Sequence, residues 1–212
     1  MSVITQTNLN TVTQPLLTLR HITWQTYENL LVDLDGQSGV HLTFDQGVLE
    51  IMTLTPEHES INRYLSSLID LLVDELGKDV HPVGSATFKR ADVERGFEPD
   101  SSFYFTQATQ MRGKKRIDLR VDPAPELVIE IDISHGSLDK SSIFAQFGIA
   151  ETWRYDGANI HIYHLVDEAY EEQSRSTVFP KLTADKIEQF LVNSQTMMRQ
   201  ELKQWLRQNL PR

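Results

Sequence analysis

The sequence contains no cysteine in its 212 residues. Disulfide bonds, thiolate nucleophiles and every zinc or iron–sulfur site held by cysteine are therefore excluded. The side chains left for acid–base or metal chemistry are carboxylates, histidine and lysine.

Positive charge is also scarce, since 20 Lys and Arg stand against 30 Asp and Glu, for a formal net charge of −10. A protein that coats nucleic acid without specificity needs a broad positive surface. The composition therefore argues against that class of protein, while leaving room for a local basic groove.

Long apolar runs are absent as well. No stretch approaches the roughly 20 apolar residues of a membrane-spanning helix, and residues 1–19 lack the basic start and apolar centre of a signal peptide. We expect residues 1–20 to be a flexible leader and the protein to be cytoplasmic, with no membrane partner. The rest suits one α/β domain over residues 21–180 with a C-terminal helical extension over 181–212.

Helical and extended patterns alternate along the chain. The clearest helix begins at Thr55 and Pro56 and ends at Gly77. Further helices are expected over 23–33, 137–147 and, with a break near 193–194, 183–210. Strands are expected over 40–44, 48–54, 82–90, 98–105, 127–133, 151–156, 160–166 and 174–179. This order predicts a mixed α/β fold with a central sheet flanked by helices.

The strand over 127–133 carries two acids on one face. Glu130 and Asp132 are two residues apart, so they lie about 7 Å from each other on a surface that is usually buried. The charge that balances them is either a divalent cation or a basic side chain from elsewhere in the fold. Asp100, next to Pro99, offers a third carboxylate, and Lys140 follows on the next helix.

Several motifs together carry a resemblance to a known family. They are Glu98-Pro99-Asp100, the run from Pro125 to Ser134, Leu138-Asp139-Lys140, and the run from Gly148 to Trp153. In order and spacing they resemble the Uma-type restriction endonuclease family of the PD-(D/E)XK nuclease superfamily, over roughly residues 23–165.

The resemblance implies a restriction-endonuclease-like core around a four-stranded mixed sheet and Mg²⁺-dependent hydrolysis of DNA, with Mn²⁺ as a substitute. Asp100 and Glu130 match the metal ligands, assisted by the backbone carbonyl of Ile131. The superfamily lysine normally stands two residues after the glutamate, where this chain has Asp132. Lys140 resembles a migrated substitute that positions water or shields charge, and Asp132 would widen the site or accept a proton.

Two further features are candidates for the site. His58 stands three residues before Ile61, on the inward stripe of the helix over 55–77, and the family also has a histidine there. Arg112, Lys114, Lys115, Arg116 and Arg120 place five basic residues in nine positions. That segment suits DNA phosphates, although a helix-start histidine and a solvated loop are the plainer interpretations.

Three functions stay open from the sequence. The first is a Mg²⁺-dependent DNA endonuclease, and the second is a catalytically impaired relative that binds DNA or a protein partner, as Asp132 in place of lysine suggests. The third is an assembly role in which the helices over 183–210 join two copies into a homodimer.

Overall fold

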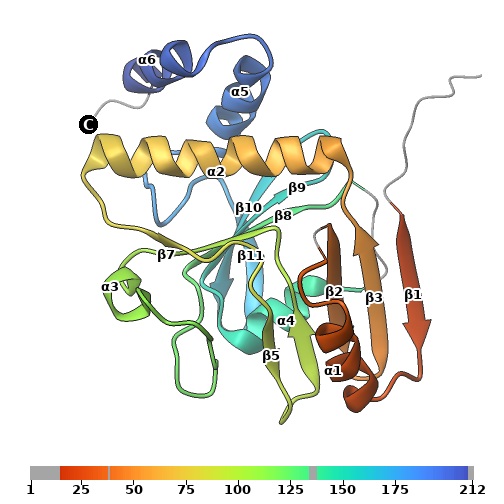
Figure 1. Ribbon diagram of the computed structural model, residues 1–212. Coiled ribbons are helices and arrows are strands. Elements are labelled where there is room, and N and C mark those ends of the chain that lie inside the picture. Colours follow the sequence, from red (N-terminus) through yellow and green to blue (C-terminus); the bar gives the residue numbers. More distant parts are fainter. Residues whose placement is uncertain (1–14, 38, 134–137, 210–212) are drawn as a thin grey trace, which may run out of the picture.

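Two β-sheets form the frame of the molecule, which the computed structural model describes over residues 15–37, 39–133 and 138–209 (Figure 1). The first sheet is antiparallel, in the order β1 (Leu16–Arg20), β3 (Val48–Thr53), β2 (Val40–Asp45), β6 (Arg95–Phe97) and β5 (Phe88–Arg90). The second has the order β11 (Ala169–Gln173), β10 (Ile160–Val166), β9 (Glu151–Tyr155), β8 (Leu127–Ile131), β7 (Ser101–Tyr104) and β4 (His81–Pro82).

The second sheet is the central mixed sheet that the sequence predicts. Its strands β8 and β9 are parallel, while each of the other pairs is antiparallel. It has six strands, which extends the four that the resemblance implies. The mixed α/β class is thereby confirmed, with an additional sheet beside the central one.

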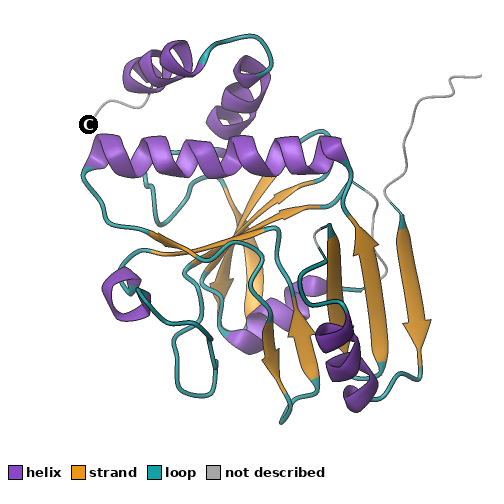
Figure 2. Ribbon diagram, in the orientation of Figure 1, coloured by secondary structure: helices purple, strands orange, loops and turns teal. Residues whose placement is uncertain are grey.

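Helices cover both faces of the central sheet (Figure 2). Helix α2 (Pro56–Leu76) lies along one face, α5 (Ala184–Ser194) packs against both α2 and β10, and α6 (Arg199–Asn209) packs against α5. Helix α4 (Lys140–Phe147) packs on the opposite face, α1 (Trp24–Asp33) covers the first sheet, and the single-turn α3 (Ala108–Met111) precedes a long loop. No helix among the described residues is both long and apolar enough to cross a membrane.

Strand β8 has the alternation that the sequence predicts. Leu127, Ile129 and Ile131 pack in the core under α2, whereas Val128 packs in the separate core under α4. Because side chains alternate along a strand, Glu130 shares the α4 face with Val128. The end of β8 therefore presents a carboxylate between the central sheet and α4.

The long helix α2 also begins and ends as expected. The Thr55 hydroxyl accepts the His58 N–H at 3.2 Å, Pro56 occupies the first helical position, and Gly77 ends the helix with a φ of 61°. These local signals fix where the first turn of α2 lies. His58 is thus positioned in that turn by the cap itself.

Four expectations need correction. The single strand expected over 82–90 is two short strands in different sheets, β4 and β5. Leu16–Arg20, which the sequence assigns to a flexible leader, form β1, because their backbone pairs in antiparallel register with β3. The strand expected over 174–179 lies earlier, at β11, because Asp167 and Glu168 both adopt positive φ and close a tight hairpin after β10. Helix α4 begins at Lys140, and Ser137, where it was expected to begin, lies outside the described residues.

The C-terminal helices are part of the main core. Ile187 and Phe190 of α5 and Leu202 and Leu206 of α6 are buried in the same cluster as the inward residues of β8. The break expected near 193–194 is confirmed, because α5 ends at Ser194 and α6 begins at Arg199.

Candidate active site

Asp100 directly precedes β7 and is buried, at 3% exposure of the residue. One oxygen, Oδ2, accepts the backbone N–H of Ile131 at 2.7 Å, which ties the end of β8 to Asp100. His58 Nε2 lies 3.1 Å from Oδ2 and His41 Nδ1 lies 3.2 Å from Oδ1. Among the described residues, neither imidazole nitrogen is aligned as a hydrogen-bond donor to this carboxylate, and Oδ1 has no hydrogen-bond partner.

Helix α2 holds this corner through residues four positions apart on one face. Besides His58, Asn62 donates to the backbone carbonyl of Asp100 at 3.0 Å and accepts the Ser101 hydroxyl at 2.8 Å. Ser66, one turn further, lies 3.1 Å from the same hydroxyl. The helix thus positions Asp100 through both its side chain and its backbone.

Glu130 and Lys140 meet on the α4 face of β8. Glu130 is 5% exposed, and Lys140, the first residue of α4, donates from Nζ to its Oε2 at 2.5 Å. The other oxygen, Oε1, is buried and has no hydrogen-bond partner among the described residues. A buried carboxylate oxygen without a donor is costly unless a ligand or ion completes it.

A cleft of about 140 Å³ opens between the two sheets at this point. Its walls carry both acids and bases. They include His41, Thr43, Glu50 and Met52 of the first sheet, Glu130 and Ile131 of β8, Lys140 and Phe144 of α4, and Thr152 and Arg154 of β9. Asp100 contacts the cleft through His41.

The charges of this cluster shift one another's pKa values. Burial raises the pKa of Glu130. The positive charge of Lys140 lowers it in part, and the negative charge of Asp100 raises it further. Burial acts in the same sense on Asp100, but His41, His58 and Lys140 outweigh it and hold the pKa of Asp100 below its usual range. For Lys140, burial lowers the pKa, yet Glu130 and Asp100 raise it above the ordinary value. Lys140 is therefore a cation at neutral pH and not a general base.

The carboxylate oxygens of the site are suitable ligands for a hard divalent cation. Asp100 Oδ1 and Glu130 Oε1 are buried carboxylate oxygens left without donors among the described residues. The same part of the chain contains no group of three or more His, Asp or Glu side chains arranged as a metal cage. Mg²⁺ commonly binds through one or two carboxylates and retains several waters. Two carboxylates are therefore enough to bind it here.

Asp132 lines the same cleft as Glu130 but has a different cationic partner. Its Oδ2 accepts Arg154 Nη2 at 2.5 Å, and its side chain is 25% exposed. The structure therefore pairs Asp132 with an arginine of β9, while Glu130 pairs with Lys140.

The basic segment after α3 lies at the opposite end of β8 from Glu130. Its residues precede the start of the strand, and α3 lies on the far side of the molecule from β2 and β3 in Figure 1. Three of its cations pair with local acids: Arg112 with Asp79, Lys114 with Asp122, and Arg120 with Asp118. Lys115 and Arg116 are exposed.

Sequence reasoning missed three residues of this site: His41, Glu50 and Asn62. Glu50 is 3% exposed and accepts the backbone N–H of Leu138 at 2.9 Å, beside α4. The strands predicted over 40–44 and 48–54 contained a usable signal, because when they pair as β2 and β3, Thr43 lies opposite Glu50 and His41 opposite Met52. These four residues share one face of the sheet, which turns toward the cleft.

The fold and the comparisons with known proteins together define the class of the protein. The chain is similar to a crystal structure from Anabaena variabilis described as "a putative nuclease belonging to DUF820". The TM-score is 0.56 at 13% identity, over 80% of this chain and 99% of that one, which shows a common fold. No curated protein sequence matches the chain.

Residues 24–191 match the Uma2 family, described as "Putative restriction endonuclease". The match spans most of the chain, so this protein belongs to the Uma2 family. The restriction-endonuclease-like class predicted from the sequence motifs is thereby confirmed.

Proposed function

We propose that this protein is a Mg²⁺-dependent endonuclease that hydrolyses DNA phosphodiester bonds with activated water. The observation that supports this most is the buried pair Asp100 and Glu130, each with an oxygen that no described residue hydrogen-bonds. Beside the pair stands Lys140, a cation whose pKa is raised by these same acids. Family membership supports the nuclease class.

Asp100 and Glu130 are the residues that hold the metal in this proposal. A bound Mg²⁺, or Mn²⁺ in its place, supplies a water of lowered pKa and stabilises charge on the phosphate. His41 and His58 orient the Asp100 carboxylate. Lys140 stays protonated and stabilises the negative charge that develops on the phosphate during attack.

The test is relaxation of a supercoiled plasmid by the purified chain. We expect nicking or cutting with Mg²⁺ or Mn²⁺, none with EDTA, and loss of activity in Asp100→Asn. Glu171→Gln, a change on the exposed strand β11, is the control that should keep full activity. Cleavage in EDTA, or an Asp100→Asn variant as active as the control, would sink the proposal.

The position of Asp132 favours a second candidate function. The resemblance expects a lysine two residues after Glu130, and this chain has an acid there, paired with Arg154. A catalytically impaired protein that binds DNA or a protein partner would bind a labelled duplex equally well with Mg²⁺ and with EDTA. It would leave the plasmid intact under both conditions, which separates it from the endonuclease.

The remaining expectations stay predictions. Arg112, Lys114, Lys115 and Arg116 are proposed to contact DNA beyond the cleft. A homodimer joined through α5 and α6 would have to use exposed residues such as Val192 and Met198, because the buried faces of these helices pack into this chain's own core. Sedimentation measures the oligomeric state directly. The cytoplasmic location remains a prediction.

A further inference from the structure

An arginine stands directly beside Glu130 in the central sheet. In the parallel register of β8 and β9, Glu130 is the partner of Arg154, so their backbones are neighbours across one strand spacing. The Arg154 side chain is 43% exposed and lines the same cleft as Glu130 and Lys140. A guanidinium thus lies at the mouth of the cleft, next to the proposed metal ligand.

Most of this guanidinium remains available to a ligand. Among the described residues its hydrogen-bond acceptor is Asp132, which takes Nη2 at 2.5 Å. An arginine has five N–H donors in a planar fork, so the others can serve another acceptor. Lys140, by contrast, is 25% exposed and donates to Glu130.

The cleft needs such a cation if an anionic substrate is to enter. Glu50, Glu130 and Asp132 all line it, and their charge repels a phosphate. Lys140 already balances Glu130. Arg154 is the more exposed of the two cations, and its fork matches two oxygens of a phosphate.

Resting on the nuclease function above, we propose that Arg154 binds a backbone phosphate of DNA next to the bond that is cut, and that Asp132 positions its guanidinium. Arg154 thus adds a second cation to the cleft, beside Lys140. Asp132 acts through Arg154 and does not accept a proton.

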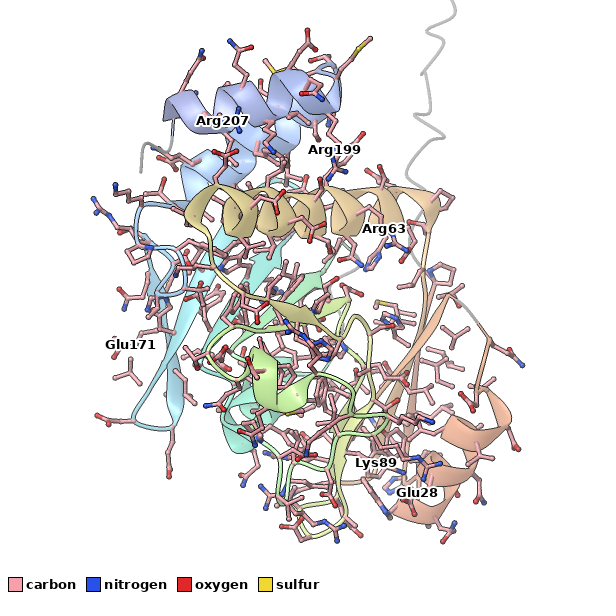
Figure 3. The ribbon with its side chains drawn as sticks, turned by 60° about the vertical axis from the view of Figure 1, so that its left-hand side comes forward. Glu28, Arg63, Lys89, Glu171, Arg199 and Arg207 are labelled. Carbon is pink, nitrogen blue, oxygen red and sulfur yellow. The ribbon has the colours of Figure 1, made fainter. Side chains whose placement is uncertain are left out.

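The first experiment measures duplex binding by fluorescence anisotropy in EDTA, between about 50 and 200 mM salt. Each phosphate contact adds about 0.9 to the slope of log affinity against log salt. We expect Arg154→Met to lower the slope by about that amount, and Arg154→Lys to keep most of it. The matched control is Arg207→Met, because Arg207 of α6 is also exposed and paired with an acid, Glu75, at 2.7 Å (Figure 3).

The outcomes separate the two proposals. If Arg154→Met binds with the slope and affinity of the wild type, this inference is overturned while the nuclease function stands. If the wild type neither binds nor cuts DNA, the proposed function itself fails. Arg154→Lys guards against misfolding, since it keeps the ion pair with Asp132.

The second experiment tests Asp132 through the sign of an effect on KM for plasmid cleavage. Asp132→Asn removes a negative charge from the cleft, which by simple electrostatics strengthens DNA binding and lowers KM. If Asp132 positions Arg154, Asp132→Asn instead raises KM with little change in kcat. Asp132→Glu should then have a KM between those of the wild type and Asp132→Asn. A lowered KM would exclude the positioning role.

Discussion

Two buried glutamates of the central sheet differ in how completely their oxygens are bonded. Glu151, at the start of β9, accepts Trp153 Nε1 at 2.6 Å, Thr177 N at 2.6 Å and Val178 N at 3.3 Å. Glu130, near the end of β8, accepts Lys140 on one oxygen, and its other oxygen has no hydrogen-bond partner among the described residues.

The two residues are 1% and 5% exposed, so burial alone does not distinguish them. What differs is the completeness of the hydrogen bonds. A carboxylate with full bonding stabilises the fold around it, whereas one with a free buried oxygen keeps capacity for a ligand. The same isosteric change, Glu to Gln, should therefore have opposite consequences at the two sites.

The largest expected effect is on cleavage by Glu130→Gln. A neutral amide loses the charge that holds the metal, and metal stabilisation of the transition state amounts to several kcal/mol, or on the order of 10³-fold in rate. Single-turnover cleavage of a labelled duplex measures it. The free energy of unfolding should change little, because Lys140 can turn toward solvent. A variant that cleaves normally would remove Glu130 from the site.

Glu151→Gln should do the reverse. Its amide NH₂ meets N–H donors in place of an acceptor, and the loss of charged hydrogen bonds in a buried site costs about 3 kcal/mol. Urea unfolding followed by circular dichroism measures this. Glu171→Gln on exposed β11 is the control and should stay within about 0.5 kcal/mol of the wild type. If Glu151→Gln is as stable as that control, the comparison fails on its structural side.

The comparison also shows which parts of the molecule the sequence could predict. The caps of α2 and the alternation of β8 are local signals, so the helix boundaries and the faces of Glu130 and Val128 follow from the sequence. The resemblance adds that Asp100 and Lys140 belong with Glu130. Lys140 does contact Glu130, and Asp100 binds the backbone of the next residue, Ile131.

The features that could not be predicted from the sequence depend on pairing between residues far apart in the chain. Strand β1 can be identified as a strand only from its pairing with β3. The polar strand β11 lacks the alternation of apolar and polar residues that marks a strand. Arg154 is brought beside Glu130 by the register of two strands, and the pair of Arg112 with Asp79 is set by tertiary packing. Such partners depend on how the elements are arranged in space.

A smaller effect is expected at His58, which tests how Asp100 is held. His58 is fully buried and lies 3.1 Å from Asp100 Oδ2. Residues that orient a metal ligand typically change metal affinity by about 10- to 100-fold when removed. His58→Ala should therefore weaken Mn²⁺ binding, measured by calorimetry, within that range. Ser66→Ala, on the same face of α2 but in contact with Ser101, should change it less. Equal affinities in both variants would show that His58 serves packing alone.

The smallest effect concerns the basic segment at the far end of β8. Lys115 and Arg116 are exposed, whereas Arg112 of the same segment pairs with Asp79, which follows α2. If the segment contacts DNA, the double change Lys115→Ala and Arg116→Ala lowers the salt slope of duplex binding by up to about 1.8, with cleavage at saturating DNA unchanged. The single change Arg112→Ala lowers the slope by at most about 0.9. An unchanged slope in the double variant would leave the cleft, with Arg154, as the DNA-binding surface and remove the segment from it.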